Sequence, residues 1–196
     1  MCSSDLTDRI MDIMNEEDLY LNENQKKGTD KFTKHPYSEE FNVLFEKFLD
    51  KKIRLLEIGA YYGASTIIWD KYFPLGDITV LDIEPRTALD NIVGRVDPNR
   101  TRIIINDAYD EEFAKKLGTF DIINDDGPHD LVSQLECLDI YYPLLNEGGY
   151  LIIEDIPDAQ WLDLMKDKVP EGKFKTIDYH AQNRGASDSR LFICWK

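Results

Sequence analysis

The sequence has no long apolar run and few cysteines. No stretch of about 18 apolar residues is available for a membrane-spanning helix, and the N-terminal residues MCSSDLTDRI lack the basic region and apolar core of a signal peptide. Cys2, Cys137 and Cys194 are odd in number and widely separated, which favours free thiols in a reducing compartment over disulfides or a zinc cluster. We therefore expect a cytoplasmic protein without a membrane segment.

Basic residues are also scarce. The chain has 23 Lys and Arg against 38 Asp and Glu, which gives a formal net charge of -15. Because nucleic-acid binding requires clustered basic side chains that displace counterions, this composition argues against a nucleic-acid partner. Most of the carboxylates are expected on a solvated surface. A length of 196 residues with 42% hydrophobic residues suits one domain, residues 1–196, built on a sheet with helices on both faces.

The pattern of apolar residues changes near residue 50. Apolar residues recur at helical spacing in 6–14 and again in 41–49, so residues 1–50 are predicted as a helical extension or lid, with Ser38 as a candidate cap of the second helix. Residues 51–196 are predicted as a Rossmann-like α/β core, in which short apolar runs alternate with amphipathic segments. The runs are IRLLEIG, ITVLDI, RIIIN, FDIIND and GGYLIIED.

Continuous apolar runs indicate strands that are buried on both faces. They predict a mostly parallel sheet with right-handed crossovers. Helices are expected from about Ala64, near Ala88 and Phe113, over LVSQLECLDIYYPLL and from Trp161 to Lys168. FKTIDY and RLFICW are two further strands, expected as an antiparallel pair at one edge. In open sheets of this kind ligands bind outside the carboxyl ends of the strands.

The first of these strands ends in a glycine loop, LLEIGAYYGAST. Tyr61 stands where a dinucleotide-binding fingerprint has its middle glycine, and no lysine follows Gly63, so the loop is neither that fingerprint nor a P-loop. It is a glycine turn that begins a helix and is preceded by an acid, Glu57. Glycines allow the main chain to approach a ligand without interference from a Cβ atom.

This loop resembles the first motif of class I S-adenosylmethionine (SAM) methyltransferases, E/D-x-G-x-x-x-G. The resemblance implies a sheet in the order 3-2-1-4-5-7-6 with an antiparallel last strand, and a loop that lies against the methionine part of SAM. Asp82, at the end of the second strand, is expected to accept hydrogen bonds from the ribose hydroxyls, and Asp107 and Ala108 are expected near the adenine ring. The implied cofactor residues are Glu57, Gly59, Ala60, Tyr61, Gly63, Ser65, Asp82, Ile83, Asp107, Ala108 and Asp125.

Acidic residues are concentrated where the fourth and fifth strands end, in DIINDDGPHD and GGYLIIEDI. If these strands are neighbours, about 4.8 Å apart, then Asp126, Glu154 and Asp155 converge and repel one another unless a cation neutralises them. Mg²⁺ is the expected ion, with Ca²⁺ or Mn²⁺ as alternatives. His129 is a candidate general base. The alternative is a set of separate solvated carboxylates, with Asp125 or Asp126 capping the next turn.

The motifs GTDKFTKHPY, LLEIGAYYGAST, IINDDGPHD and GGYLIIEDI, in that order, resemble the metal-dependent sugar O-methyltransferases of macrolide biosynthesis, the mycinamicin and macrocin type. The resemblance covers about residues 28–156, with Pro128 where that family usually has serine. It implies Asp126, Glu154 and Asp155 as Mg²⁺ ligands and His129 as the base. It also implies methyl transfer from SAM to a sugar hydroxyl of a small molecule or glycan, and leaves a homo-oligomer open.

Three alternatives remain at this point. They are a catechol-type O-methyltransferase, a cephalosporin hydroxylase-like enzyme and a non-catalytic SAM-binding module. Within GTDKFTKHPY, His35 and Tyr37 are candidates for lining a lid over the cofactor or the acceptor. His180 and the loop 183–189 are candidates for contacting the acceptor from the other side.

Overall fold

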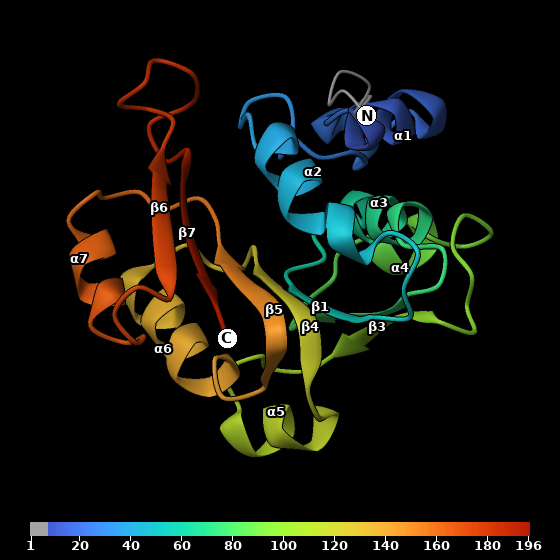
Figure 1. Cartoon of the computed structure of the whole chain (residues 1–196). Coiled ribbons are helices and arrows are strands. Elements are labelled where there is room, and N and C mark those ends of the chain that lie inside the picture. Colours follow the sequence, from blue (N-terminus) through green and yellow to red (C-terminus); the bar gives the residue numbers. More distant parts are fainter. Residues whose placement is uncertain (1–7) are drawn as a thin grey trace, which may run out of the picture.

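The computed structural model describes residues 8–196, which fold around a seven-stranded sheet (Figure 1). The strand order is β3-β2-β1-β4-β5-β7-β6, and β7 runs antiparallel to both of its neighbours while the other pairs are parallel. The predicted order and the predicted antiparallel pair at one edge are both confirmed. The strands are β1 (Arg54–Ile58), β2 (Asp77–Asp82), β3 (Thr101–Ile105), β4 (Phe120–Asp125), β5 (Leu145–Ile153), β6 (Phe174–Asp178) and β7 (Arg190–Trp195).

The central strands are apolar on both faces, and this is why helices must cover both. Leu55 of β1 and Ile122 of β4 are fully buried in one hydrophobic cluster, whereas the next residues, Leu56 and Ile123, are fully buried in a second cluster. Because successive side chains of a strand point to opposite faces, the two clusters lie on opposite sides of the sheet.

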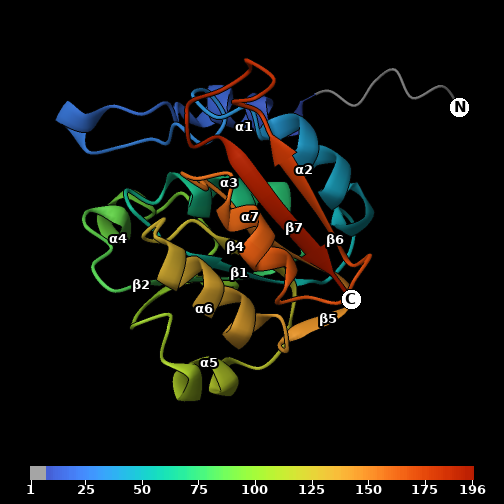
Figure 2. The same cartoon turned by 90° about the vertical axis from the view of Figure 1, so that its left-hand side faces the viewer.

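Helices α1 to α4 lie on one side of the sheet, and α5, α6 and α7 lie on the other (Figures 1 and 2). The predicted helix near Ala88 is only a single turn, α4, and the helix expected to reach Lys168 ends at Lys166. The helices are α1 (Arg9–Glu17), α2 (Ser38–Phe45), α3 (Ala64–Tyr72), α4 (Ala88–Asn91), α5 (Glu111–Leu117), α6 (Leu131–Tyr141) and α7 (Trp161–Lys166), with 3-10 turns η1 (Glu23–Gln25) and η2 (Glu46–Phe48).

The segment that leads into α2 belongs to the core on the α3 side. Phe32, Tyr37 and Phe41 are buried. The Phe41 ring packs against the rings of Phe32 and Tyr37, and both Phe32 and Phe41 pack against Trp69 of α3. The segment GTDKFTKHPY is therefore anchored by aromatic side chains at the carboxyl end of the sheet.

The N-terminal helices differ from the prediction at one cap, and one residue of the predicted first helix is not described. Ser38 does not cap the second helix, because α2 begins at Ser38 itself and Tyr37 stands at the cap position. The Ser38 hydroxyl instead donates to Asp8 Oδ2 at 2.7 Å, and Asp8 caps α1 by accepting from the Met11 N–H. Leu6, which contributed to the predicted first helix, lies outside the described residues.

The cysteines that are described carry no disulfide. Cys137 and Cys194 are free and fully buried, and burial raises the pKa of the Cys194 thiol to about 12. Cys2 lies outside the described residues. Within residues 8–196, no helix has the length and apolar character that crossing a membrane requires.

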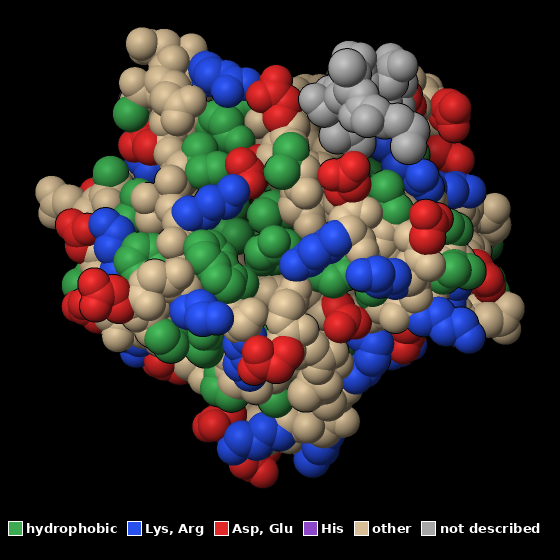
Figure 3. All heavy atoms as spheres, viewed as in Figure 1, with side chains coloured by type: hydrophobic (Ala, Val, Ile, Leu, Met, Phe, Trp, Pro, Cys, Tyr) green, Lys and Arg blue, Asp and Glu red, His purple; other side chains and the backbone are tan. Residues whose placement is uncertain are grey.

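The surface near β5 and β7 is hollowed. Figure 3 shows hydrophobic side chains in this hollow with lysine or arginine side chains around it, and a cavity of about 260 Å³ there includes Lys47, Tyr150, Lys175 and Trp195 in its lining. These lysines already have partners in the chain. Lys47 lies 3.9 Å from the Tyr150 ring centre and donates to the Gly148 carbonyl, and Lys175 pairs with Glu40.

Candidate active site

Strand register brings the predicted acidic residues to one edge of the sheet. Asp125, the last residue of β4, pairs with Ile58 of β1 on one side and with Ile153 of β5 on the other. The Asp126 N–H donates to the Ile58 carbonyl, and the Glu154 N–H donates to the Asp125 carbonyl. Asp126 and Glu154 therefore lie side by side at the ends of the adjacent strands β4 and β5. The sequence predicted this, because each acid comes directly after one of these strands.

A cavity of about 440 Å³ opens at the ends of β1, β2 and β4 and beside the loop after β3. Six of the predicted cofactor residues line it, namely Gly59, Tyr61, Asp82, Ile83, Asp107 and Ala108. The rest of its lining is Ile58, Leu81, Glu84, Arg86, Tyr109, Asp126, Gly127 and Pro128.

A second cavity, of about 380 Å³, lies beside the first and is lined by Tyr61, Asp126 and Gly127 in common with it. It brings together five segments of the sequence: the 28–35 segment, the glycine loop with the start of α3, the loop after β4, Asp155 after β5, and Asp188 before β7. Two more predicted cofactor residues, Ala60 and Ser65, lie in its lining. Glu57, Gly63 and Asp125 line neither cavity.

The two glycines of the first loop are fixed by packing within the chain. Gly59 has φ +95°, and a Cβ atom there would lie 2.1 Å from the Asp126 carbonyl oxygen. Gly63 has φ +83°, and a Cβ atom there would lie 3.1 Å from the Ala88 carbonyl oxygen. Gly59 thus allows the loops after β1 and β4 to touch, and Gly63 allows α3 to begin close to α4.

Asp82 holds the glycine loop in place. Its Oδ2 accepts from the N–H groups of Ala60 at 2.7 Å and Tyr61 at 3.3 Å, and its Oδ1 accepts from the Glu84 N–H at 2.7 Å. A carboxylate offers about four lone-pair positions, so Asp82 keeps acceptor capacity toward the cavity that it lines. The expected ribose contact of Asp82 stays a prediction.

Lys31 is a buried cation that sequence reasoning missed. Its side chain is 2% exposed, and its Nζ lies 3.1 Å from Glu57 Oε1, 2.9 Å from Asp126 Oδ2 and 2.5 Å from Glu154 Oε1. Burial opposes the charged form, but the carboxylates of Asp126, Glu154 and Glu57 outweigh it and raise the pKa of Lys31 well above its usual range. Lys31 therefore stays protonated and joins the 28–35 segment to β1, β4 and β5.

Two of the predicted site residues are occupied by this network. Glu57 is fully buried, and its second oxygen accepts from the Ser65 hydroxyl at 2.8 Å. Glu154 is 1% exposed and also accepts from the Asn124 amide at 2.6 Å. Glu154 Oε1 already pairs with Lys31. The role of Glu154 as a metal ligand therefore stays a prediction.

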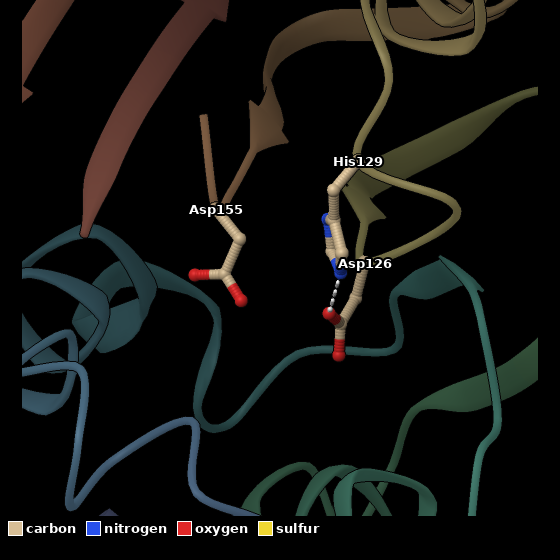
Figure 4. Close-up of side chains that lie close together, drawn as sticks. All are labelled: Asp126, His129 and Asp155. Carbon is tan, nitrogen blue, oxygen red and sulfur yellow. Dashed lines mark ion pairs between the residues drawn. The ribbon is translucent and has the colours of Figure 1, made fainter. Parts of the chain in front are cut away.

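Asp126, His129 and Asp155 form an open group that faces the second cavity (Figure 4). Each offers a ligand atom, and these atoms lie within 4.8 Å of one another. His129 Nε2 lies 3.5 Å from Asp126 Oδ1. Burial, and then the charge of Asp126, raise the pKa of Asp155, with His35 opposing the rise. Because a cation between these oxygens would offset their repulsion, the group suits an ion that prefers carboxylate ligands.

Two residues predicted for a lid hold Asp155 in this group. The Tyr37 hydroxyl donates to Asp155 Oδ1 at 2.7 Å, and His35 Nδ1 lies 3.2 Å from the same oxygen. His35 and Tyr37 are 1% and 0% exposed, so they support the site from beneath, and only His35 reaches the lining of the second cavity. His180 lines neither of the two site cavities, while the loop 183–189 contributes Asp188.

The remaining predicted cofactor residue, Asp125, lies beneath the site. It is 2% exposed, and the Tyr109 hydroxyl donates to its Oδ1 at 3.4 Å. Burial raises the pKa of Asp125 to about 7, with His129 opposing the rise. The Asp125 carboxyl group therefore gains or loses its proton near neutral pH, and not in the acidic range that is usual for aspartate.

Backbone strain is concentrated at this site. Among residues 8–196, seven non-glycine residues have positive φ, and four of them line the two cavities. They are Tyr61 (φ 45°), Arg86 (φ 46°), His129 (φ 58°) and Asp155 (φ 53°). Left-handed conformations of such residues cost free energy and are typically retained at ligand sites.

Comparison with known proteins agrees with this geometry. Residues 56–156, just over half of the chain, match the family described as a methyltransferase domain. The chain belongs to this methyltransferase family. The matched range begins in β1 and ends just past Asp155, so it contains both strand ends that build the acidic group.

Two similar proteins are named as O-methyltransferases of mycinamicin VI and of a rhamnosyl tetracenomycin. This methyltransferase is 30% identical over 138 residues to mycinamicin VI 2''-O-methyltransferase of Micromonospora griseorubida, covering 65% of this chain and 33% of the relative. It is 28% identical over 145 residues to 8-demethyl-8-alpha-L-rhamnosyl tetracenomycin-C 2'-O-methyltransferase of Streptomyces olivaceus, covering 68% of this chain and 36% of the relative. The chain thus spans about a third of the length of these relatives.

Solved structures share the fold. The MycE methyltransferase of the mycinamycin biosynthetic pathway, in complex with Mg and SAH, superposes with a TM-score of 0.70 at 23% identity, over 96% of this chain and 54% of that chain. The SAH-bound Podospora anserina methyltransferase PaMTH1 superposes with a TM-score of 0.62 at 17% identity, over 97% of this chain and 89% of that chain. These similarities establish the predicted Rossmann-like methyltransferase fold.

Some cavity residues of the methyltransferase carried no signal in the sequence. Arg86 lies over the Tyr61 ring at 4.8 Å, and the Tyr61 hydroxyl donates to Glu23 at 2.8 Å, so two other segments hold Tyr61 at the first cavity. Glu84 and Tyr109 also line it. A periodic pattern identifies strands and helices, but it does not indicate which loop residues turn toward a shared cavity.

Proposed function

We propose that this chain is a SAM-dependent O-methyltransferase that requires a divalent cation, Mg²⁺ first, and methylates a hydroxyl group of a sugar. One observation carries the proposal. The two cavities meet at Tyr61, Asp126 and Gly127, so a donor in the first cavity and an acceptor in the second would adjoin beside the acidic group. The relatives named as O-methyltransferases of mycinamicin VI and of a rhamnosyl tetracenomycin support the same assignment.

The first cavity is assigned to SAM, whose sulfonium supplies an electrophilic methyl group when bound. Gly59, Asp82 and Asp107 line this cavity at the ends of β1, β2 and β3, where open α/β sheets bind nucleosides. Ala60 and Ser65 extend the glycine loop into the second cavity. Eight of the eleven predicted cofactor residues therefore line one or both cavities, in keeping with a ligand that reaches from one into the other.

The second cavity is assigned to the acceptor. A divalent cation bound by carboxylates there would increase the acidity of an acceptor hydroxyl. Asp126 and Asp155 are the residues proposed to hold it, with Glu154 behind them in the network of Lys31. Tyr37 and His35 keep Asp155 turned toward this group through contacts at 2.7 and 3.2 Å.

His129 is assigned as the group that accepts the proton of the acceptor hydroxyl. Its side chain is one third exposed and lines the second cavity, and Nε2 lies 3.5 Å from Asp126 Oδ1. Among the described residues, no group hydrogen-bonds to the buried Nδ1. A positioned imidazole contributes about 10²- to 10⁴-fold in rate as a general base.

The test is methyl transfer from SAM labelled in its methyl group. Purified protein is offered a panel of sugar glycosides and, separately, catechols, with Mg²⁺ or with excess EDTA, while binding of S-adenosylhomocysteine is measured by calorimetry. The proposal expects labelled sugar only with Mg²⁺, and S-adenosylhomocysteine binding in both conditions. Sugar methylation that survives thorough chelation removes the metal from the proposal.

Other outcomes of the same test select the alternatives. Methylated catechol without methylated sugar identifies a catechol-type enzyme. Oxygen uptake without methyl transfer favours a cephalosporin hydroxylase-like enzyme. Tight S-adenosylhomocysteine binding with neither reaction identifies a binding module.

A further inference from the structure

We propose that Asp188 recognises the acceptor and that the acceptor is a sugar without anionic groups, either uncharged or amino-bearing. This inference rests on the proposed function, because it assigns the chemical class of the molecule that enters the second cavity. It depends on three observations: the charge of the cavity lining, an unpartnered oxygen of Asp188, and the rigid loop that carries this residue.

The lining of the second cavity is strongly acidic. Four carboxylates line it, those of Asp30, Asp126, Asp155 and Asp188, against a single lysine, Lys34. Lys31, the other cation nearby, is 2% exposed and is already surrounded by Glu57, Asp126 and Glu154. Even with a divalent cation bound, the carboxylates of the lining outnumber its positive charges. A phosphate or carboxylate on the acceptor would enter against this field.

Asp188 offers a hydrogen-bond acceptor that the described chain does not use. Its side chain as a whole is 34% exposed, but the Oδ1 atom is shielded from solvent and no described group hydrogen-bonds to it. The nearest ionisable partner is His35, whose Nδ1 lies 4.0 Å away and contacts the Ser189 hydroxyl at 2.8 Å. Because an unsatisfied buried carboxylate oxygen is costly, a ligand donor such as a hydroxyl or an ammonium group fits this position.

The loop that carries Asp188 is held firmly on both sides. Arg190, which is 7% exposed, donates to the carbonyls of Ser187 at 2.6 Å, Ile156 at 2.9 Å and Pro157 at 3.0 Å. Its Nε also donates to Asp178 Oδ2 at 2.8 Å. The guanidinium thereby ties the loop before β7 to the chain that follows Asp155.

The opposite side of this loop packs on the 28–37 segment. A Cβ atom at Gly185 would lie 2.6 Å from the Ser189 side chain and 3.1 Å from Pro36. Asp188 therefore lies in a fixed position relative to His35 and Asp155. Such a position suits recognition, because little conformational entropy is lost when the acceptor binds.

Two variants separate the charge of Asp188 from its hydrogen bond. Asp188→Asn keeps an acceptor oxygen and removes the charge, whereas Asp188→Ala removes both. Asp163→Asn is the matched control, because Asp163 is an exposed acid of α7 that pairs with Lys166 and lies outside both site cavities. Circular dichroism and urea unfolding verify that all three variants are folded.

The probes are three methyl glycosides that differ in one substituent: a glucoside, a glucosaminide and a glucuronoside. Binding is measured by calorimetry with Mg²⁺ and S-adenosylhomocysteine present, and methylation is measured with labelled SAM. We expect the glucuronoside to bind at least about tenfold more weakly than the other two. Asp188→Ala should raise KM for the glucoside about tenfold with kcat nearly unchanged, Asp188→Asn should weaken the preference against the glucuronoside, and Asp163→Asn should do neither.

The outcomes distinguish this inference from the proposed function. If the glucuronoside binds as well as the glucoside, or if Asp188→Ala behaves like Asp163→Asn, the assignment of Asp188 and of the acceptor class is wrong while sugar methylation stands. If S-adenosylhomocysteine binds but none of the glycosides binds or is methylated, the proposed sugar methylation fails, and the inference fails with it.

Discussion

Lys31 places one positive charge among three carboxylates, those of Glu57, Asp126 and Glu154. Replacing it with methionine would leave these carboxylates together without their cation, and breaking a buried ion pair in this way typically costs about 3–5 kcal/mol. We expect Lys31→Met to lower the free energy of unfolding by that order in urea. The pH should be fixed near 7, where the ammonium of the wild-type protein is charged.

A second substitution tests the cause. If the loss comes from uncompensated charge, adding Glu154→Gln to Lys31→Met should recover part of the stability, because one carboxylate fewer is left unpaired. An equal loss in the single and double variants would mean that the unpaired charge of Glu154 is not the cause. The cation–π contact of Lys31 Nζ, 6.0 Å from the Trp69 ring centre, would then be the interaction that the substitution removes.

His129 supports a prediction about rate. Glutamine retains hydrogen-bonding capacity but cannot accept a proton at neutral pH, so His129→Gln should lower kcat by about 10²- to 10⁴-fold. The dissociation constant of S-adenosylhomocysteine should change little, because His129 lines the second cavity and not the first. Stopped assays with labelled SAM give kcat, and calorimetry gives the dissociation constant. A variant with wild-type kcat would exclude His129 as the base.

Lys31 and His129 differ in how clearly the sequence shows that they belong to the site. Asp126, His129 and Asp155 lie within four residues of the ends of apolar strands. Strand ends that share an edge bring such residues together, so their proximity was predictable. Lys31 lies in a segment without strong periodicity, 26 residues from Glu57 and 123 residues from Glu154. Phe32 packs on Trp69 of α3 and Tyr37 packs on Phe41 of α2, and these tertiary contacts help to hold Lys31 at the strand ends.

At the scale of single elements, the strands were more predictable than the helix ends. Short, mostly apolar runs such as Arg54–Ile58 favour a buried strand, and the structure confirms all seven predicted strands. The prediction that Ser38 caps the second helix is wrong. Tyr37 takes the cap position, and the Ser38 hydroxyl donates to Asp8. The hydrogen bond between Ser38 and Asp8 links α1 to α2, and a pattern of neighbouring residues in the sequence does not reveal such a contact.

The β6–β7 pair has an ion pair whose pH dependence can be stated. Burial acts to raise the pKa of Asp178, but the Ala181 N–H and the Arg190 guanidinium outweigh it, so the pKa lies below its usual value. A carboxyl group with a lowered folded-state pKa adds stability above its unfolded pKa, about 3.9, and this stability is lost as the pH falls through the folded-state pKa. Asp178 therefore stabilises the fold at neutral pH.

Asp178→Asn should accordingly reduce the free energy of unfolding by about 1–2 kcal/mol at pH 7, as expected for one charge-assisted hydrogen bond. The difference from the wild-type protein should shrink below about pH 4, where Asp178 becomes protonated as well. Urea unfolding at several pH values between 3 and 7 measures this. A difference that stays constant over this range would show that the ion pair with Arg190 contributes no pH-dependent stability.

At the scale of the whole molecule, the net charge of -15 bears directly on any test for the metal. A divalent cation will bind weakly to an acidic surface and screen its self-repulsion, and this stabilises the fold without a specific site. Stabilisation by Mg²⁺ is therefore informative only when the surface contribution is subtracted. The proposed ligand Asp126 and the exposed Asp163 provide a matched pair, because each substitution to asparagine removes one negative charge.

At constant ionic strength, we expect Mg²⁺ to raise the melting temperature of the wild-type protein and of Asp163→Asn. The increase should saturate as the Mg²⁺ concentration rises. A ligand present at 100 times its dissociation constant stabilises the folded state by about 2.7 kcal/mol. Asp126→Asn should lose the saturable part and retain only the weak linear part, while S-adenosylhomocysteine still raises its melting temperature. Because the Lys31 network also changes in Asp126→Asn, Asp155→Asn serves as a second variant. Saturable stabilisation that persists in both variants would place the ion elsewhere on this acidic chain.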